Sequence, residues 1–108
     1  YDRDVKHVAG GIIDVEFIVQ ALILIHASER PDLLDNLGNR ALLLRMGAHG
    51  LIPADEAAAA GAAYVAFREY QQWAALDEHE PRLDDAHPFT DARAAVSQLW
   101  HRVFGTRT

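Results

Sequence analysis

A cation and two adjacent glycines precede a long apolar run near the start of the chain. Lys6 is followed by Gly10 and Gly11, and residues 12–26 are mostly apolar. Glycines let a backbone approach a ligand closely, and a helix N-terminus presents N–H groups that have no partner within the helix. With a lysine, these are the components of a phosphate site. A glycine pair before a helix is more often only a turn, so both interpretations stay open.

Three further polar residues interrupt the apolar run. Asp14 and Glu16 look like the paired carboxylates that hold magnesium, but residues two apart on a helix point about 200° away from each other and cannot share one ion. Glu16 and Gln20 are four apart, so they share a face, as part of a site or as the one hydrated strip of a buried helix. The residues that we call the polar collar are Lys6, Gly10, Gly11, Asp14, Glu16 and Gln20.

The histidines and serines give no catalytic pattern. No two histidines have the i, i+3 or i, i+4 spacing that places two imidazoles on one helix face, and no His-Glu-x-x-His motif occurs. Ser28 and Ser97 have no neighbouring base pattern. The six histidines are His7, His26, His49, His79, His87 and His101. The sequence therefore predicts no catalytic residue and no metal site in this chain.

Composition narrows the class of protein. The 108 residues are half apolar, which is enough for one domain with a core, and the absence of cysteine is compatible with a reducing compartment, so we expect a cytoplasmic protein. A net charge of −6 argues against nucleic acid as a partner. The longest apolar stretch, residues 17–25, is too short for the ~20 residues that cross a bilayer, so no membrane association is expected. Acidic residues cluster in 77–86, as a solvated loop or a partner surface.

The apolar spacing predicts an all-α fold, a helical bundle of four main helices. The first is expected from Gly11 or Ile12 to about Ala27. It is apolar nearly all round, which predicts a central helix wrapped by neighbours. The residues expected on its inward face are Val15, Ile18, Val19, Leu22 and Ile25, with a second apolar face of Phe17, Ala21 and Leu24.

Turn and cap residues divide the rest of the chain. A second helix is expected over 39–48, with Leu37, Leu42, Leu43 and Met46 inward and Gly47 and Gly50 as candidates for its C-cap. The third and longest helix should follow Pro53 and end near Leu76, with Ala60, Ala63, Tyr64, Phe67, Tyr70 and Ala74 inward. Thr90 is expected to cap the fourth helix, which Gly105 ends. Its predicted inward residues are Ala92, Val96, Leu99, Trp100 and Val103.

The amino-acid sequence around the collar also resembles a motif of a known family. The run DVKHVAGGIIDVEFIVQ is similar to the signature D-[IL]-K-x-x-x-G-G-[IL]-x-[DE]-[IV]-E-F-x-x-Q of glutamine synthetase adenylyltransferases, from which only Val5 departs mildly. The stretch from Arg30 to Gln72 and the run FTDARAAVSQLWHRVFG, which includes Trp100, resemble later parts of the same family. The resemblance therefore covers nearly the whole chain.

The resemblance implies that the chain is a segment of an enzyme with two catalytic domains. In that family, one nucleotidyltransferase domain removes AMP from glutamine synthetase and the other transfers AMP from ATP, with Mg²⁺, to a tyrosine of glutamine synthetase, under control of the PII signalling protein. This chain resembles the helical domain that follows the second catalytic domain, because Asp14 stands where the first half usually has Glu. It lacks the Gly-Ser strand turn that accompanies the magnesium-binding D-x-D carboxylates in the catalyst. Residues 1–108 are thus expected to be a single helical domain, inactive alone, whose collar faces the active-site cleft of an adjacent nucleotidyltransferase domain.

Three other interpretations remain. The domain could be a docking module that uses its outer surface, including the acidic segment 77–86, to bind glutamine synthetase or a regulator. The collar could be only a polar interface that holds two domains in register. The related helical domain of a PII uridylyltransferase is the third alternative.

Overall fold

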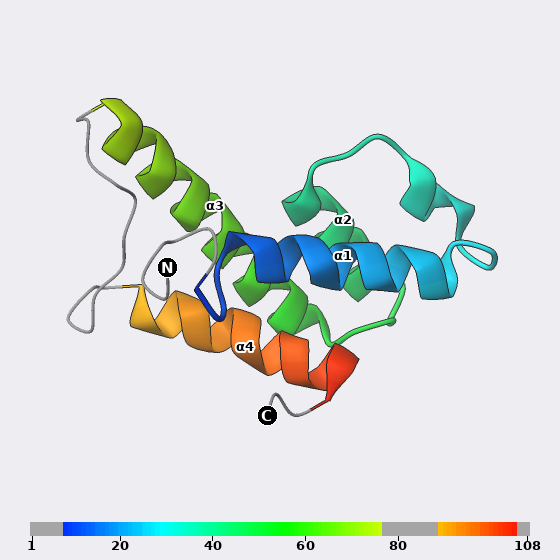
Figure 1. The fold of residues 1–108 in the computed structure, drawn as a ribbon. Coiled ribbons are helices and arrows are strands. Elements are labelled where there is room, and N and C mark those ends of the chain that lie inside the picture. Colours follow the sequence, from blue (N-terminus) through cyan, green and yellow to red (C-terminus); the bar gives the residue numbers. More distant parts are fainter. Residues whose placement is uncertain (1–7, 77–88, 106–108) are drawn as a thin grey trace.

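The structure is a computed structural model that describes residues 8–76 and 89–105. Within these ranges the chain is all-helical, which confirms the predicted fold class (Figure 1). The elements are α1 (Ile12–His26), the 3₁₀-helix η1 (Pro31–Leu34), α2 (Asn39–Ala48), α3 (Ala54–Leu76) and α4 (Thr90–Phe104). None of these helices is long and apolar enough to cross a membrane.

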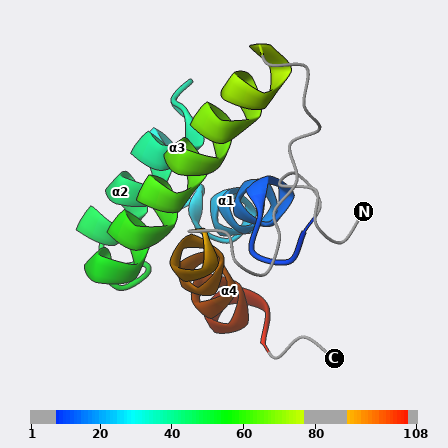
Figure 2. The same ribbon diagram turned by 90° about the vertical axis from the view of Figure 1, so that its left-hand side faces the viewer.

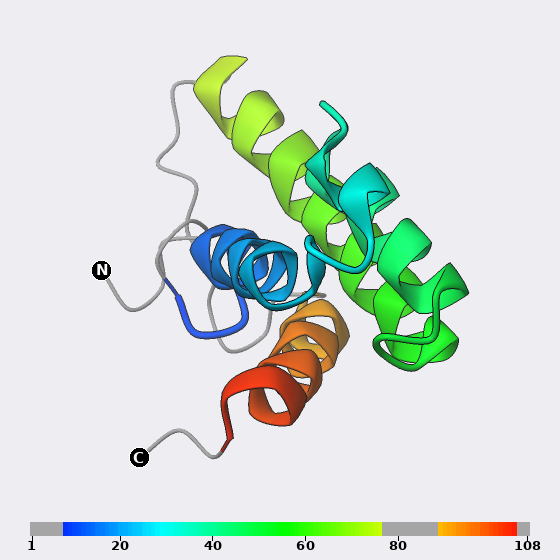
Figure 3. The same ribbon diagram turned by 90° about the vertical axis from the view of Figure 1, so that its right-hand side faces the viewer.

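The four helices pack together as one bundle. Helices α2 and α3 are joined by a short connection and lie side by side as a helical hairpin (Figure 2). Helix α4 packs against α3, and α1 packs against α4 and contacts α2 and α3 (Figure 3). The other three helices lie on one side of α1, so its opposite side meets no helix of the described residues.

The core lies where all four helices meet. Burial of apolar side chains from every helix stabilises this arrangement by removing their surface from water. Phe67 of α3 packs edge-to-face on Phe89, which precedes α4, with ring centroids 5.4 Å apart. The largest fully buried side chains are Phe67, Ile12, Ile18, Leu33, Leu43, Met46, Leu99, Val15, Val19 and Val96.

The two glycines expected at the end of α2 have different roles. Gly50 has a φ of +76°, its N–H donates to the Gly47 carbonyl at 3.0 Å, and the Leu51 N–H donates to the Met46 carbonyl at 3.0 Å. These two bonds are those of a Schellman motif, so Gly50 ends the helix. Gly47 lies inside α2, where an added Cβ would come within 2.9 Å of the Cβ of Ala57. It therefore allows α2 to approach the start of α3.

The prediction that α1 is wrapped on all sides is wrong. Phe17, Leu24 and Ile25 are 55%, 82% and 63% exposed, although Ile25 was expected to point inward. The physical reason is that α1 packs on the bundle from one side only, and its last turn extends beyond α4 (Figure 1). The predicted inward residues Val15 and Ile18 are buried.

Two smaller expectations also fail. Leu37, expected inward, is 38% exposed because it lies in the connection before α2 rather than on that helix. Thr90 is the first residue of α4, and the N-cap position belongs to Phe89, which makes no side-chain cap hydrogen bond. Phe89 instead packs its ring on α3, where it also meets Tyr70 with centroids 5.4 Å apart.

Candidate functional site

The start of the polar collar is a tight turn over residues 8–11. The Gly11 N–H donates to the Val8 carbonyl at 2.8 Å. Gly10, at the third position of the turn, has a φ of +78°. A positive φ at this position is the mark of a type II turn, and glycine adopts it without steric cost. The glycine pair before α1 therefore lies in a tight turn.

Asp14 folds back onto this turn. Its Oδ2 accepts a hydrogen bond from the Gly10 N–H at 2.7 Å, and its side chain is buried, with 7% of the residue exposed. Asp14 lies in the first turn of α1, where the helix dipole favours a carboxylate. A carboxylate of the protein itself thus occupies the anion position at the Gly10 amide.

The same turn is pressed against α4. A Cβ on Gly10 would lie 2.4 Å from the Arg93 carbonyl oxygen and 2.9 Å from the Ser97 hydroxyl oxygen, so no larger residue fits without movement. The Arg93 side chain also donates from Nε to the Ala9 carbonyl at 3.2 Å. These contacts fix the entrance of α1 on α4.

The remaining collar residues are placed differently. Gly11 is buried as the N-cap residue of α1, whereas Gln20 is exposed and Glu16 is half-buried on the outward side of the helix. Lys6 and the acidic segment 77–86 lie outside the described residues. The structure therefore brings Gly10 and Asp14 into direct contact and places Glu16 and Gln20 on the outer part of α1.

Within residues 8–76 and 89–105, no three histidine, aspartate or glutamate side chains are grouped so that they could hold a metal ion. Every buried side-chain nitrogen or oxygen in these ranges has a hydrogen-bond partner. In the described part of the collar, no buried polar side chain therefore lacks a hydrogen-bond partner that a ligand would have to supply.

A bidentate ion pair connects α3 with α4. Arg102 donates from Nε to Glu56 Oε1 at 2.7 Å and from Nη2 to Glu56 Oε2 at 2.6 Å. The hydrogen bond from Arg102 to Glu56 raises the pKa of the guanidinium above its already high ordinary value. The planar fork of arginine matches both carboxylate oxygens, which fixes the geometry of the pair.

A second polar cluster holds η1 on α2. His49 Nε2 lies 2.7 Å from Asp32 Oδ2, and Arg45 Nη1 donates to the Asp32 carbonyl at 2.8 Å and to Asp35 Oδ2 at 2.6 Å. The hydrogen bond with His49 is the main reason why the pKa of Asp32 lies below its ordinary value of 3.8. The nearby charges of His49 and Arg45 act in the same direction.

Sequence reasoning missed both clusters. Glu56 was recognisable as a carboxylate near the start of a helix, but its partner is 46 residues away. Arg45 on α2 and His49, the C-cap residue of that helix, are four residues apart, which was a weak signal that both side chains reach the same neighbour.

The comparison with protein families identifies the chain. The model of the GlnD PII-uridylyltransferase family matches residues 1–105. The chain belongs to this family. The comparison with solved structures found no match.

Three curated relatives of the chain carry the same description, "Bifunctional glutamine synthetase adenylyltransferase/adenylyl-removing enzyme". The Burkholderia mallei protein is 41% identical over 102 residues, 94% of this chain and 11% of that protein. The Nitrosomonas europaea protein is 44% identical over 118 residues, 95% of this chain and 13% of that protein. The Chromobacterium violaceum protein is 44% identical over 105 residues, 96% of this chain and 12% of that protein.

These relatives confirm the resemblance seen in the collar and the later segments. The chain is homologous to a segment of a glutamine synthetase adenylyltransferase. It spans only 11–13% of the length of these three relatives, so the homology covers one segment of each of them.

Proposed function

We propose that the chain is a helical domain of a bifunctional glutamine synthetase adenylyltransferase and adenylyl-removing enzyme. It supports transfer of AMP from ATP to a tyrosine of glutamine synthetase in the cytoplasm, under control of the PII protein. ATP and Mg²⁺ are bound by an adjacent nucleotidyltransferase domain, and the helical domain is not itself the catalyst. The similarity to relatives of this description over 94–96% of the chain supports the proposal.

The polar collar is proposed to face the cleft of that catalytic domain. The observation that carries this role is the Gly10–Asp14 hydrogen bond, together with the close contact of Gly10 with Arg93. Both hold the turn before α1 in one position. A rigid turn suits a cleft wall, because a group held in place needs no ordering when substrate binds.

Within the collar, Lys6 is the group that we propose to meet the phosphates of ATP. The Gly10 N–H is already bonded to Asp14, and the charge of this carboxylate opposes a second anion at the same amide. Lys6 precedes the turn in the sequence and supplies the only cation of the collar. Glu16 and Gln20, which lie on the outer part of α1, are proposed as further polar contacts of the cleft.

The test is Lys6→Ala in the full-length enzyme, with Lys6→Arg as the charge-retaining control. Loss of a charge-assisted contact of roughly 1.5–3 kcal/mol lowers adenylylation by about ten- to a hundredfold. Deadenylylation and thermal stability should stay unchanged, and Lys6→Arg should keep most of the activity. Equal losses of both activities with a lowered melting temperature would instead assign the collar to a structural interface.

A second candidate is the helical domain of a PII uridylyltransferase, because the matching family model carries that description. The discriminating assay gives the full-length enzyme ATP with glutamine synthetase and, separately, UTP with PII protein. AMP incorporation into glutamine synthetase supports the first proposal, and UMP incorporation into PII supports the second.

A further inference from the structure

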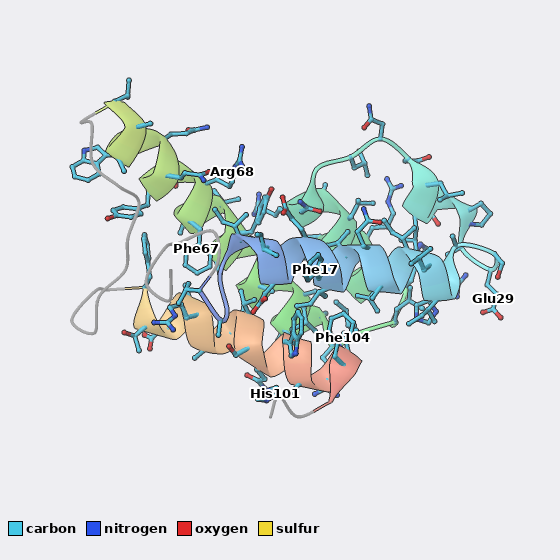
Figure 4. The ribbon with its side chains drawn as sticks, in the orientation of Figure 1. Phe17, Glu29, Phe67, Arg68, His101 and Phe104 are labelled. Atoms are coloured by element: carbon cyan, nitrogen blue, oxygen red, sulfur yellow. The ribbon has the colours of Figure 1, made fainter. Side chains whose placement is uncertain are left out.

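Helix α1 presents large apolar side chains on the side that none of the other described helices covers. Phe17 and Leu24 are seven residues apart, two helical turns, and therefore share a face. Ile13 and Ala21 lie beside them on that face and are half-buried. Figure 4 shows Phe17 midway along α1 at the front of the molecule. These four residues, Ile13, Phe17, Ala21 and Leu24, form what we call the α1 stripe.

The stripe differs from the outward face of the neighbouring helix α4. Most residues exposed there are polar, and they include Asp91, Gln98 and Arg102. Single exposed apolar residues are normal in soluble proteins, but a continuous row of them usually marks a contact surface. Along the stripe only Gln20 and Glu16 supply polar groups, and both lie on the same edge.

The size and charge of the surface restrict what can cover it. A 15-residue helix is about 22 Å long, so a stripe roughly 10 Å wide covers about 220 Å². This area is far smaller than the ~800 Å² per partner that a stable complex of separate chains usually needs. A net charge of −6 also opposes association with a second copy of this chain. A domain joined to the stripe in one polypeptide can be held by a weaker contact, because the covalent connection gives a high effective concentration.

We propose that the α1 stripe, which no other helix of residues 8–76 and 89–105 covers, is the surface on which an adjacent folded domain of the same polypeptide packs. That domain contributes an apolar face to Phe17 and Leu24, and donor groups at its rim meet Glu16 and Gln20. This inference rests on the proposed function only in placing the chain within a larger enzyme. The relatives are longer polypeptides of this kind, since the matched segment spans only 11–13% of their length.

The direct test is hydroxyl-radical footprinting of Phe17 and Leu24 in the 108-residue chain and in the full-length enzyme. The oxidation rate of both side chains should fall severalfold in the full-length enzyme, whereas that of Leu76, 88% exposed at the far end of α3, gives the reference rate within each protein. Equal oxidation of Phe17 and Leu24, relative to Leu76, in both proteins would overturn the proposal. This measurement needs no variant.

A matched pair of variants adds an energetic test. Leu24→Gln should leave the melting temperature of the 108-residue chain unchanged, because Leu24 is exposed there, but should lower that of the full-length enzyme and restore oxidation of Phe17. Leu76→Gln should do neither. Concentration-dependent dimers of the 108-residue chain that Leu24→Gln abolishes would show that a second copy covers the stripe, and would refute the proposal. Lys6→Ala without effect on adenylylation would refute the role of Lys6 while leaving the footprint intact.

Discussion

Substitution of Gly10 by alanine should be among the most damaging small changes in this chain. Two independent costs combine at this position. The φ of +78° is a left-handed conformation that costs a residue with a Cβ about 1–2 kcal/mol. The new Cβ would also lie 2.4 Å from the Arg93 carbonyl oxygen, a backbone atom of α4 that cannot rotate away.

Gly50 provides the matched control. Its φ of +76° is nearly the same, but an added Cβ would meet no atom within 4 Å. Gly50→Ala should therefore cost only the conformational term, about 1–2 kcal/mol. Gly10→Ala adds the cost of overpacking, typically 1–3 kcal/mol, for a total of about 2–5 kcal/mol. The lost flexibility of the unfolded chain is similar in both variants and cancels in the comparison.

The measurement is urea unfolding of both variants, followed by circular dichroism at 222 nm. The denaturant slope should stay constant, and the midpoint for Gly10→Ala should lie clearly below that for Gly50→Ala. Equal midpoints would refute the reasoning, because they would show that α4 does not press on the turn. An Asp14→Asn variant should lie between Gly10→Ala and the unmodified chain, since its amide can still accept from the Gly10 N–H but lacks the charge.

Three other outcomes are expected from local contacts. Leu22→Ala should lower the free energy of unfolding by about 2–5 kcal/mol, since Leu22 is buried, and a loss under about 1 kcal/mol would contradict its place in the core. His49→Ala should move acid unfolding to higher pH: the pKa of Asp32 is lower in the folded state, so its contribution is complete above 3.8 and disappears as pH falls through the folded value. An acid transition unchanged by His49→Ala would contradict this role. Arg102→Lys should lower the melting temperature more at low salt than at high salt, because lysine cannot form both bonds to Glu56, and a salt-independent effect would argue against the ion pair.

The sequence by itself determined the local structure of this protein. Apolar spacing, Pro53 and Gly105 predicted four helices close to their observed bounds, because helix formation and termination depend on residues within a few positions of each other. The glycine turn before α1 and the glycine end of α2 were predictable for the same reason. The resemblance in the collar was also a property of the sequence alone, and the relatives confirm it.

Tertiary structure alone decided which surfaces are covered and which polar groups meet. An apolar run predicts burial, but not whether one side or all sides of a helix receive neighbours, so the exposure of Phe17 and Leu24 could not be foreseen. The inward position of Asp14 depends on the turn that α4 holds in place, and the Glu56–Arg102 pair depends on the packing of α3 against α4. Contacts between residues far apart in sequence follow from how helices pack, and packing is set by the whole core rather than by any one segment.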